Sequence, residues 1–272
     1  MDKELKYGEG QIYYQLEGEG EPVMLLHGFA EDHTIWYHQV KYLQNIFRLI
    51  IPDIPGSGRS DSLQKSLGMK EIPTMDDYAT AMKAIADAEG IEQFSIIGHS
   101  MGGYISLAFA EKYPSRIKQL GLFHSTGFPD TEEKKIARRK SNEIIRQYGS
   151  RAFLEQSIPN LFDEEFKKEK PAEVEDLIGR YANFEPDQLV SYYETMIARP
   201  DRREVLRNWE RPVLFIIGEH DKAVTMEQNL KEVHLPQCSY IHILENTAHM
   251  GMLERPGQSS QLVENFLTKT NH

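Results

Sequence analysis

A serine between glycines is the first residue whose setting suggests chemistry. Residues 98–102 read GHSMG, fit the pattern G-x-S-x-G, and directly follow the apolar run Phe94–Ile97. The pattern from Gly103 onwards is helical. A strand-to-helix turn this sharp strains the backbone of the serine, and flanking glycines avoid the clashes that larger residues would cause. We therefore predict that Ser100 is a nucleophile at the carboxyl edge of a sheet; a glycine-rich turn with a buried serine is the alternative.

A serine hydroxyl needs a base that takes its proton, and the base needs a carboxylate that orients it. Asp221 follows the apolar run Val213–Ile217, and His249 follows the run Tyr240–Leu244. This gives the chain order serine, acid, histidine that accompanies the serine motif. Because ligands bind at the carboxyl ends of parallel strands, we predict that Asp221 and His249 lie beside Ser100. The alternatives are a turn or capping role for the aspartate and a polar loop role for the histidine. Two other acids compete for the orienting role: Glu219 and Asp130.

The elements that must position these residues follow an α/β pattern. Short, nearly all-apolar runs alternate with helical patterns, and such runs are typical of parallel strands buried on both faces. The runs are 12–16, 23–26, 49–51, 94–97, 117–123, 213–217 and 240–244. Thr74 with Asp77 predicts a capped helix start, and Gly90 predicts the end of that helix. We predict a mostly parallel central sheet with helices on both faces.

Residues 127–207 interrupt this alternation. They contain no convincing strand, and Pro171 and Pro186 stand where first-turn prolines belong. Three amphipathic stripes follow one another in this stretch: Ala137, Ile144, Ile145 and Tyr148; Val174, Leu177, Ile178 and Tyr181; Leu189, Tyr193, Met196 and Ile197. We predict an inserted helical cap at 127–207 over a core domain formed by 1–126 and 208–272. Such a cap should set chain-length preference rather than the chemistry.

Composition excludes several classes of function. The chain has 272 residues, with 31 Lys plus Arg against 42 Asp plus Glu, for a formal net charge of −11. An acidic chain repels phosphate backbones, which argues against nucleic acid as a partner. Cys238 is the single cysteine, so neither an intrachain disulfide nor a cysteine-rich zinc site is expected.

The apolar runs are much shorter than the roughly twenty residues of a membrane span. The first ten residues hold no apolar run, so we expect no signal peptide and a cytoplasmic protein. No HExxH motif and no G-x-G-x-x-G after a strand is present, so no metal and no cofactor are expected. The expected partner is a small-molecule acyl substrate, and the oligomeric state stays open.

With these residues the sequence resembles the α/β-hydrolase superfamily over nearly its whole length. Two further stretches carry the resemblance: HGF at 27–29, after the run at 23–26, and DIPGSGRS at 53–60, after the next run. The resemblance is to serine-nucleophile, capped members, in the carboxylesterase, menaquinone-lyase-like or perhydrolase-like branches. A serine at the nucleophile position disfavours the aspartate-nucleophile branch of haloalkane dehalogenases and epoxide hydrolases, and HGF differs from the HGGG loop of one lipase subgroup.

The resemblance also implies an oxyanion hole and a structural loop. The backbone N–H groups of Phe29 and Met101 would hold the developing oxyanion, a term worth several kcal/mol in such sites. The stretch at 53–60 looks structural in the family, so Asp53 is left outside the predicted site.

The substrate pocket is the least determined part of the prediction. We expect Trp36, Phe128, Met196 and Met250 to line it with Phe29 and Met101, although core positions suit these apolar residues equally well. The basic run Lys134, Lys135, Arg138, Arg139 and Lys140 could attract an anionic substrate. Such a run is more typical of the solvated face of an amphipathic helix. His124 and Ser125 end a strand near the same edge, where capping a turn would suffice.

The resulting hypothesis is a cofactor-independent serine hydrolase that cleaves a small or medium carboxylic ester, or a related acyl bond, through an acyl-enzyme. Ser100, His249 and Asp221 would form the triad. A lyase, a C–C bond hydrolase or a perhydrolase could use the same triad, because fold does not determine function. A slow-turnover small-molecule receptor of the same fold is a further alternative.

Overall fold

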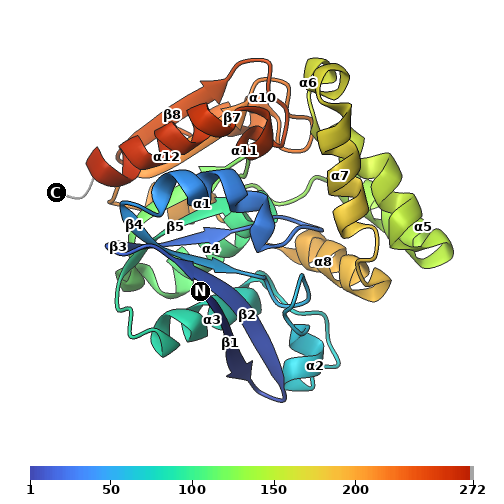
Figure 1. The fold of residues 1–272 in the computed structure, drawn as a ribbon, viewed down its shortest axis with the longest axis horizontal. Helices are drawn as coiled ribbons and strands as arrows, with labels where there is room; N and C mark the ends of the chain where they lie inside the picture. Colours follow the sequence, from blue (N-terminus) through green and yellow to red (C-terminus); the bar gives the residue numbers. More distant parts are fainter. Residues whose placement is uncertain (270–272) are drawn as a thin grey trace.

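The protein is built around one eight-stranded sheet in the order β1-β2-β4-β3-β5-β6-β7-β8. This computed structural model describes residues 1–269. The pairs β1–β2 and β2–β4 are antiparallel, and every later pair, from β3–β4 to β7–β8, is parallel. The strands are β1 (Asp2–Tyr7), β2 (Gly10–Glu17), β3 (Glu21–Leu26), β4 (Phe47–Pro52), β5 (Phe94–His99), β6 (Ile117–Phe123), β7 (Val213–Gly218) and β8 (Ser239–Leu244). Figure 1 shows how the sheet twists from β1 to β8.

Burial explains which strands the sequence revealed. Two strands inside the sheet, β5 and β7, are buried at every position, as continuous apolar runs predict. The sequence analysis missed β1, whose DKELKY sequence alternates exposed and half-buried residues at the sheet edge. On the opposite edge, β8 leaves Ile241 and Ile243 exposed on one side.

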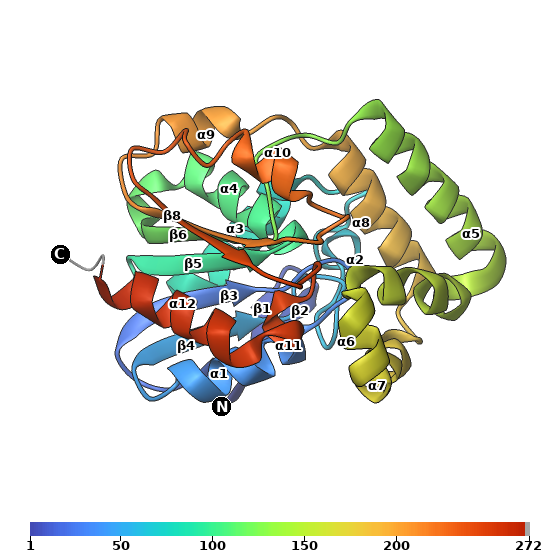
Figure 2. The ribbon, with the colours of Figure 1, turned by 90° about the horizontal axis from the view of Figure 1, so that it is seen from above.

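Helices cover both faces of the sheet, as predicted. Figure 2 shows α3 and α4 on one face and α1 and α12 on the other, and each pair buries its own apolar cluster against the strands. The helix start predicted at Thr74 is confirmed as a reciprocal capping box with Asp77. The core helices are α1 (Tyr37–Leu43), α2 (Leu63–Leu67), α3 (Met75–Ala88), α4 (Met101–Lys112), α10 (Met226–Leu230), α11 (Gly251–Glu254) and α12 (Pro256–Lys269), with short 3-10 turns η1 (His33–Trp36) and η2 (Pro114–Arg116).

A group of helices enters between β6 and β7 and gathers at one end of the sheet (Figure 2). Its elements are α5 (Glu132–Ser157), η3 (Ile158–Leu161), α6 (Glu164–Glu169), α7 (Pro171–Tyr181) and α8 (Pro186–Ala198), followed by α9 (Arg203–Arg207). We call residues 127–207 the insert. Gly149, at φ 82°, breaks α5 into two segments, a conformation that favours glycine.

The predicted stripes hold for α7 and α8 but only in part for α5. Ile145 is fully buried, whereas Tyr148 is 63% exposed and Ala137 is exposed, so α5 turns a different face inward than its apolar residues suggest. Within residues 1–269, none of the helices has the length and apolar content needed to cross a bilayer.

Candidate functional site

Ser100 occupies the strained turn that its motif predicts. It stands between β5 and α4 with φ 49° and ψ −114°, outside the allowed regions for most residues. A Cβ on Gly102 would lie 2.4 Å from the backbone oxygen of Leu26, and one on Gly98 would lie 2.4 Å from the backbone of Gly102. The glycines are therefore required by close backbone approach. The strained turn is held by a bond from the Ser100 N–H to the Phe123 carbonyl at 3.0 Å.

Asp221 and His249 meet at the end of β7, as predicted. His249 Nδ1 lies 2.8 Å from Asp221 Oδ2, and both residues are buried. The other carboxylate oxygen, Oδ1, accepts backbone N–H bonds from Ala223 and Val224. Burial alone would raise the pKa of Asp221, but His249 and the hydrogen bonds hold that pKa well below its usual value. A carboxylate fixed in this way keeps the imidazole in one orientation.

The competing acids lie elsewhere. Glu219 is exposed, and its carboxylate accepts the backbone N–H of Asn246 at 2.9 Å. Asp130 is buried between Arg138 and Arg199. Neither makes a recorded contact with the His249 ring, so the geometry favours Asp221 as the orienting acid.

Ser100 and His249 open onto the same cavity of about 130 Å³. No hydrogen bond joins the two side chains among the described residues. Catalytic hydrogen bonds are often long before substrate binds and tighten only in the complex. The cavity brings together side chains from the sheet edge and from the insert: Phe29, Glu31, Ser100, Tyr104, Arg138, Leu161, Tyr193, Met196, Ala223, Val224 and His249.

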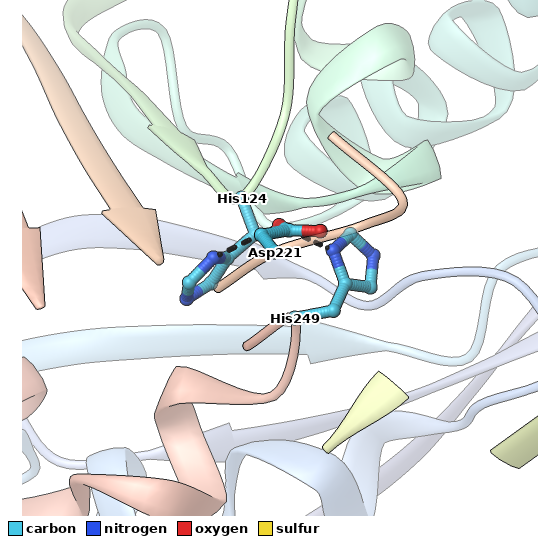
Figure 3. Close-up of side chains that lie close together, drawn as sticks. All are labelled: His124, Asp221 and His249. Carbon is cyan, nitrogen blue, oxygen red and sulfur yellow. Dashed lines mark hydrogen bonds and ion pairs between the residues drawn. The ribbon is translucent and has the colours of Figure 1, made fainter. Parts of the chain in front are cut away.

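A second imidazole contacts the same carboxylate. His124, which directly follows β6, places its Nδ1 3.3 Å from Asp221 Oδ2, so that Asp221 lies between His124 and His249 (Figure 3). Burial lowers the pKa of His124 to about 4, so its ring is neutral near pH 7. A Cβ on Gly251 would lie 2.4 Å from His124 Nε2, so this glycine makes room for the ring. The sequence analysis gave His124 only a turn-capping role.

Two groups of side chains could geometrically hold a metal ion. Asp221 with His124 and His249 is one, and Asp53 with Asp32 and His33 is the other. In both groups the carboxylate already receives hydrogen bonds. Asp53 accepts from the backbone N–H and the ring of His33, which explains the group without an ion.

The two backbone N–H groups expected to bind an oxyanion lie on different elements, that of Phe29 on the loop after β3 and that of Met101 at the start of α4. Among residues 1–269, no hydrogen-bond acceptor is recorded for the backbone N–H of Phe29 or of Met101, and Met101 is the first residue of α4. The start of a helix favours developing negative charge. These two N–H groups therefore suit an oxyanion.

A buried pair that the sequence analysis missed ties three loops together. Glu31 Oε2 accepts the Gly28 N–H at 2.6 Å and lies 3.0 Å from His99 Nδ1. His99 Nε2 in turn faces the backbone carbonyl of His249 at 3.0 Å. Burial opposes ionisation of Glu31, but His99 lowers the pKa of Glu31 below its usual value. The loop at 27–31, the serine turn and the His249 loop are thus joined through one imidazole.

The remaining signature residues are structural. His27 is fully buried, and its Nε2 accepts the Ile54 N–H at 2.9 Å while Nδ1 faces the Gly28 carbonyl. Asp53 holds His33 and the backbone N–H of Arg59. These contacts fasten the stretch at 53–60 to the oxyanion loop, and Asp53 lines neither of the two cavities near Ser100.

Glu254 is another residue that the sequence analysis missed. Its carboxylate accepts backbone N–H bonds from Ala248 and Met250, the two neighbours of His249, and from Asp163 of the insert at 2.8 Å. Burial raises the pKa of Glu254 to about 7.

Two further contacts tie the insert to the loops at the sheet edge. The His249 N–H donates to the Leu161 carbonyl at 2.9 Å, and Asp163 Oδ2 lies 2.6 Å from the His220 ring. The insert is therefore hydrogen-bonded directly to the loops that carry His249 and His220.

The expected pocket residues divide into two pairs. Met196 lines the cavity with Ser100, and Met250 lines an adjoining, mostly apolar cavity of about 70 Å³. Trp36 and Phe128 line neither cavity. Trp36 is fully buried against Phe123, with ring centroids 5.4 Å apart, and Phe128 packs against the Arg203 guanidinium at 4.1 Å. Both side chains fill other interfaces.

The sheet, the serine turn and the histidine–aspartate pair define a class. Residues 21–256 match the family model described as alpha/beta hydrolase fold, and the chain belongs to that family. Its named relatives are hydrolases, and the chain is a hydrolase of this fold.

Individual relatives are distant but span almost the whole chain. Pyrrolizixenacetamide deacetylase of Xenorhabdus hominickii is 26% identical over 269 residues, which cover 97% of each chain. The 2-hydroxy-6-oxononadienedioate/2-hydroxy-6-oxononatrienedioate hydrolase of Escherichia coli is 26% identical over 278 residues, covering 95% of this chain and 91% of its own. The solved structure of a thermophilic esterase from Thermogutta terrifontis, with malate bound, superimposes with a TM-score of 0.91 at 26% identity and covers 100% of both chains.

Proposed function

We propose that this hydrolase cleaves a small carboxylic ester, or a related acyl bond, with Ser100 as nucleophile, His249 as base and Asp221 as orienting acid. One observation carries the proposal. A strained serine and a histidine paired with a buried carboxylate open onto one cavity, beside two backbone N–H groups without an acceptor in the described chain.

The proposed mechanism gives each of these groups one role. Ser100 Oγ attacks the carbonyl carbon, and His249 takes the hydroxyl proton. The backbone N–H groups of Phe29 and Met101 stabilise the negative charge on the carbonyl oxygen. His249 then protonates the leaving alcohol, and the acyl group stays on the serine. A water that loses a proton to His249 attacks the acyl carbon, and the bond from that carbon to Ser100 Oγ breaks as His249 returns the proton to Oγ, which releases the acid and restores Ser100.

The insert completes the site in this proposal. Residues 127–207 form a cap whose Leu161, Tyr193 and Met196 enclose the cavity. A volume of about 130 Å³ favours a short acyl or alcohol group. The named relatives support the chemistry: one is an esterase and one is a deacetylase.

A C–C bond hydrolase is the second candidate. Several relatives are named as hydrolases of 2-hydroxy-6-oxo dienoates, including that of Comamonas testosteroni at 27% identity. Comparing turnover of such a dienoate with turnover of p-nitrophenyl acetate separates the two.

The proposal is tested with a fluorophosphonate probe and with p-nitrophenyl acetate. We expect labelling at Ser100 alone, and a kcat of Ser100→Ala lowered by roughly 10⁴- to 10⁶-fold. Ser115→Ala, at an exposed serine away from the cavity, is the matched control and should keep full activity. Labelling at another serine, or an active Ser100→Ala protein, would refute the mechanism.

A further inference from the structure

The basic run of α5 divides into two sets when the helix folds. Lys134 and Arg138, four residues apart, lie on one helix face and turn inward, whereas Arg139 and Lys140 are exposed. Arg138 lines the cavity that holds Ser100 and His249. A charged side chain in such a position needs a partner, because burying an unpaired charge is costly.

Within the described chain, Arg138 and a second arginine, Arg199, have only one carboxylate between them. Arg138 Nε donates to Asp130 Oδ2 at 2.6 Å, and Arg199 Nη1 lies 2.9 Å from Asp130 Oδ1. Two guanidinium groups, which stay charged at all ordinary pH, thus share one carboxylate. Arg138 Nη2 also donates to Asp130 Oδ1, at 3.5 Å, but Nη1 donates to no acceptor in residues 1–269. The Arg138 side chain is 21% exposed, whereas the Asp130 side chain is fully buried. The guanidinium therefore has donors left for a ligand.

The other charged groups around the cavity do not offset this excess of positive charge. Lys134 Nζ donates to the carbonyl of Ala223, a residue of the cavity wall, so a third basic group lies on the same side. Asp221 is occupied by His249, and Glu31 by His99. Neither Asp221 nor Glu31 contacts Arg138 through a hydrogen bond or an ion pair in the described residues.

The two cavities give the site two chemically different ends. Glu31, Phe29, Leu161 and Tyr193 line both cavities and so mark where they meet. Arg138 lines only the larger one, and the smaller one continues between apolar side chains that include Leu154, Leu177 and Met250. A negative group would be repelled by Glu31 at the junction and attracted to Arg138. The smaller cavity suits a short apolar group.

We propose that the substrate is an ester that carries a carboxylate, which Arg138 binds in the cavity while Ser100 attacks the ester carbonyl. This inference rests on the proposed function. The planar guanidinium offers paired N–H donors that match the two oxygens of a carboxylate. Arg199 remains as a partner for Asp130 when Arg138 shares its hydrogen bonds with the ligand.

The test uses pairs of esters of equal shape that differ in charge. Monomethyl succinate is paired with methyl 4-methylpentanoate, which places the charge in the acyl part. Acetoxyacetate is paired with isobutyl acetate, which places it in the alcohol part. Hydrolysis is followed in a pH-stat, and kcat/KM is compared within each pair. We expect the anionic member of at least one pair to be favoured about tenfold or more, and the favoured pair tells which part carries the carboxylate.

Variants then assign the preference to the residue. Arg138→Gln should lower the ratio of anionic to neutral kcat/KM by roughly tenfold, and Arg138→Lys should restore part of it. Arg139→Gln, the exposed neighbour, should leave the ratio unchanged. If the wild-type protein favours the neutral member of both pairs, or if Arg138→Gln keeps the wild-type ratio, the inference is overturned.

The wild-type ratio needs no variant, so a poorly folded Arg138→Gln protein does not prevent the test. Fluorophosphonate labelling of Ser100 in the same preparations distinguishes the two failures. Labelled protein without an anionic preference contradicts only the substrate class, and unlabelled folded protein contradicts the proposed function.

Discussion

The sheet-edge loops and the insert build the same cavity by different means. Around Ser100, Asp221 and His249, buried carboxylates and imidazoles bind backbone groups: Glu31 holds Gly28, and Asp221 holds Ala223 and Val224. The insert contributes side chains such as Tyr193, which stacks on Phe29 with ring centroids 4.2 Å apart.

The difference teaches where change is tolerated. A backbone N–H bond fixes a loop whatever the side chain of the donor residue is, so most side chains of these loops are free to vary. The exceptions are positions such as Gly98, Gly102 and Gly251, where close packing leaves no room for a Cβ. A cavity wall of side chains changes shape with every substitution. Specificity should therefore vary with the side chains of the insert, while catalysis depends on the backbone bonds around His249, one of which ends at Leu161 of the insert.

The largest expected effect tests the sheet-edge loops. Asp221→Asn should lower kcat by about 10⁴-fold, because an amide cannot stabilise the charged imidazole or hold its tautomer. Hydrolysis of p-nitrophenyl acetate at neutral pH measures it. Glu219→Gln, in the exposed acid two residues earlier, should cost far less. A larger loss in Glu219→Gln than in Asp221→Asn would show that the orienting acid is misassigned.

A smaller loss is expected where the two regions meet. Glu254→Ala removes the acceptor for the N–H groups on both sides of His249 and for that of Asp163. A displaced histidine should lower kcat by up to roughly 10²-fold, since small misplacements of catalytic groups have such effects. The same assay measures kcat. Glu245→Ala, at an exposed glutamate on the same loop, should remain near wild type; equal rates for both variants would show that Glu254 does not position His249.

The insert is tested by enlarging the apolar cavity. Leu177→Ala removes a buried side chain from its wall, which should raise kcat/KM for longer p-nitrophenyl esters relative to acetate by about tenfold. A series of graded chain lengths gives the ratio. Leu230→Ala, at a leucine that is 48% exposed on α10, is the control. An unchanged chain-length profile in Leu177→Ala would place specificity outside the insert.

The last prediction concerns Glu232, whose substitution should change catalysis least and should instead change the stability of the fold. Glu232 is fully buried, accepts the Gly127 N–H at the start of the insert, and burial raises its pKa from 4.5 to about 7. Its contribution to stability is complete below pH 4.5 and is lost as the pH rises to about 7, because the folded protein then holds a buried charge.

Glu232→Gln should therefore be more stable than wild type at pH 8, by up to about 3 kcal/mol. The gain should shrink towards pH 5, as urea unfolding at both pH values would show. Glu227→Gln, in the exposed acid of the helix α10 that precedes Glu232, should show no such pH-dependent gain. A constant difference between pH 5 and pH 8 would mean that Glu232 does not titrate in this range.

The placement of the candidate triad followed from the sequence because each member lies on the loop that follows a strand. Ser100, Asp221 and His249 come within a few residues of the ends of β5, β7 and β8, and parallel strands bring those ends together. The sheet and its covering helices were predicted from the same apolar runs, which alternate with helical patterns along the chain. The edge strand β1 was missed because its alternating charges leave little apolar signal.

The supporting residues had no such signal. Glu31 and Glu254 act on backbone groups, and a backbone N–H looks the same at every position of a sequence. His124 acts on Asp221 from nearly a hundred residues away. Trp36 and Phe128 were expected in the pocket as large apolar residues, but an apolar side chain suits the core as well as a pocket. Only the packing of α5 showed that Arg138 turns inward and Arg139 outward.

The bond from the His249 N–H to the Leu161 carbonyl bears on how such hydrolases can be recombined. A chimera that exchanges residues 127–207 for the insert of a relative would also exchange the acceptor that fixes the histidine loop. Grafts should therefore retain the native stretch from Leu161 to Asp163 and replace only the helices on either side. A designer who treats the insert as an interchangeable part would alter the rate along with the substrate range.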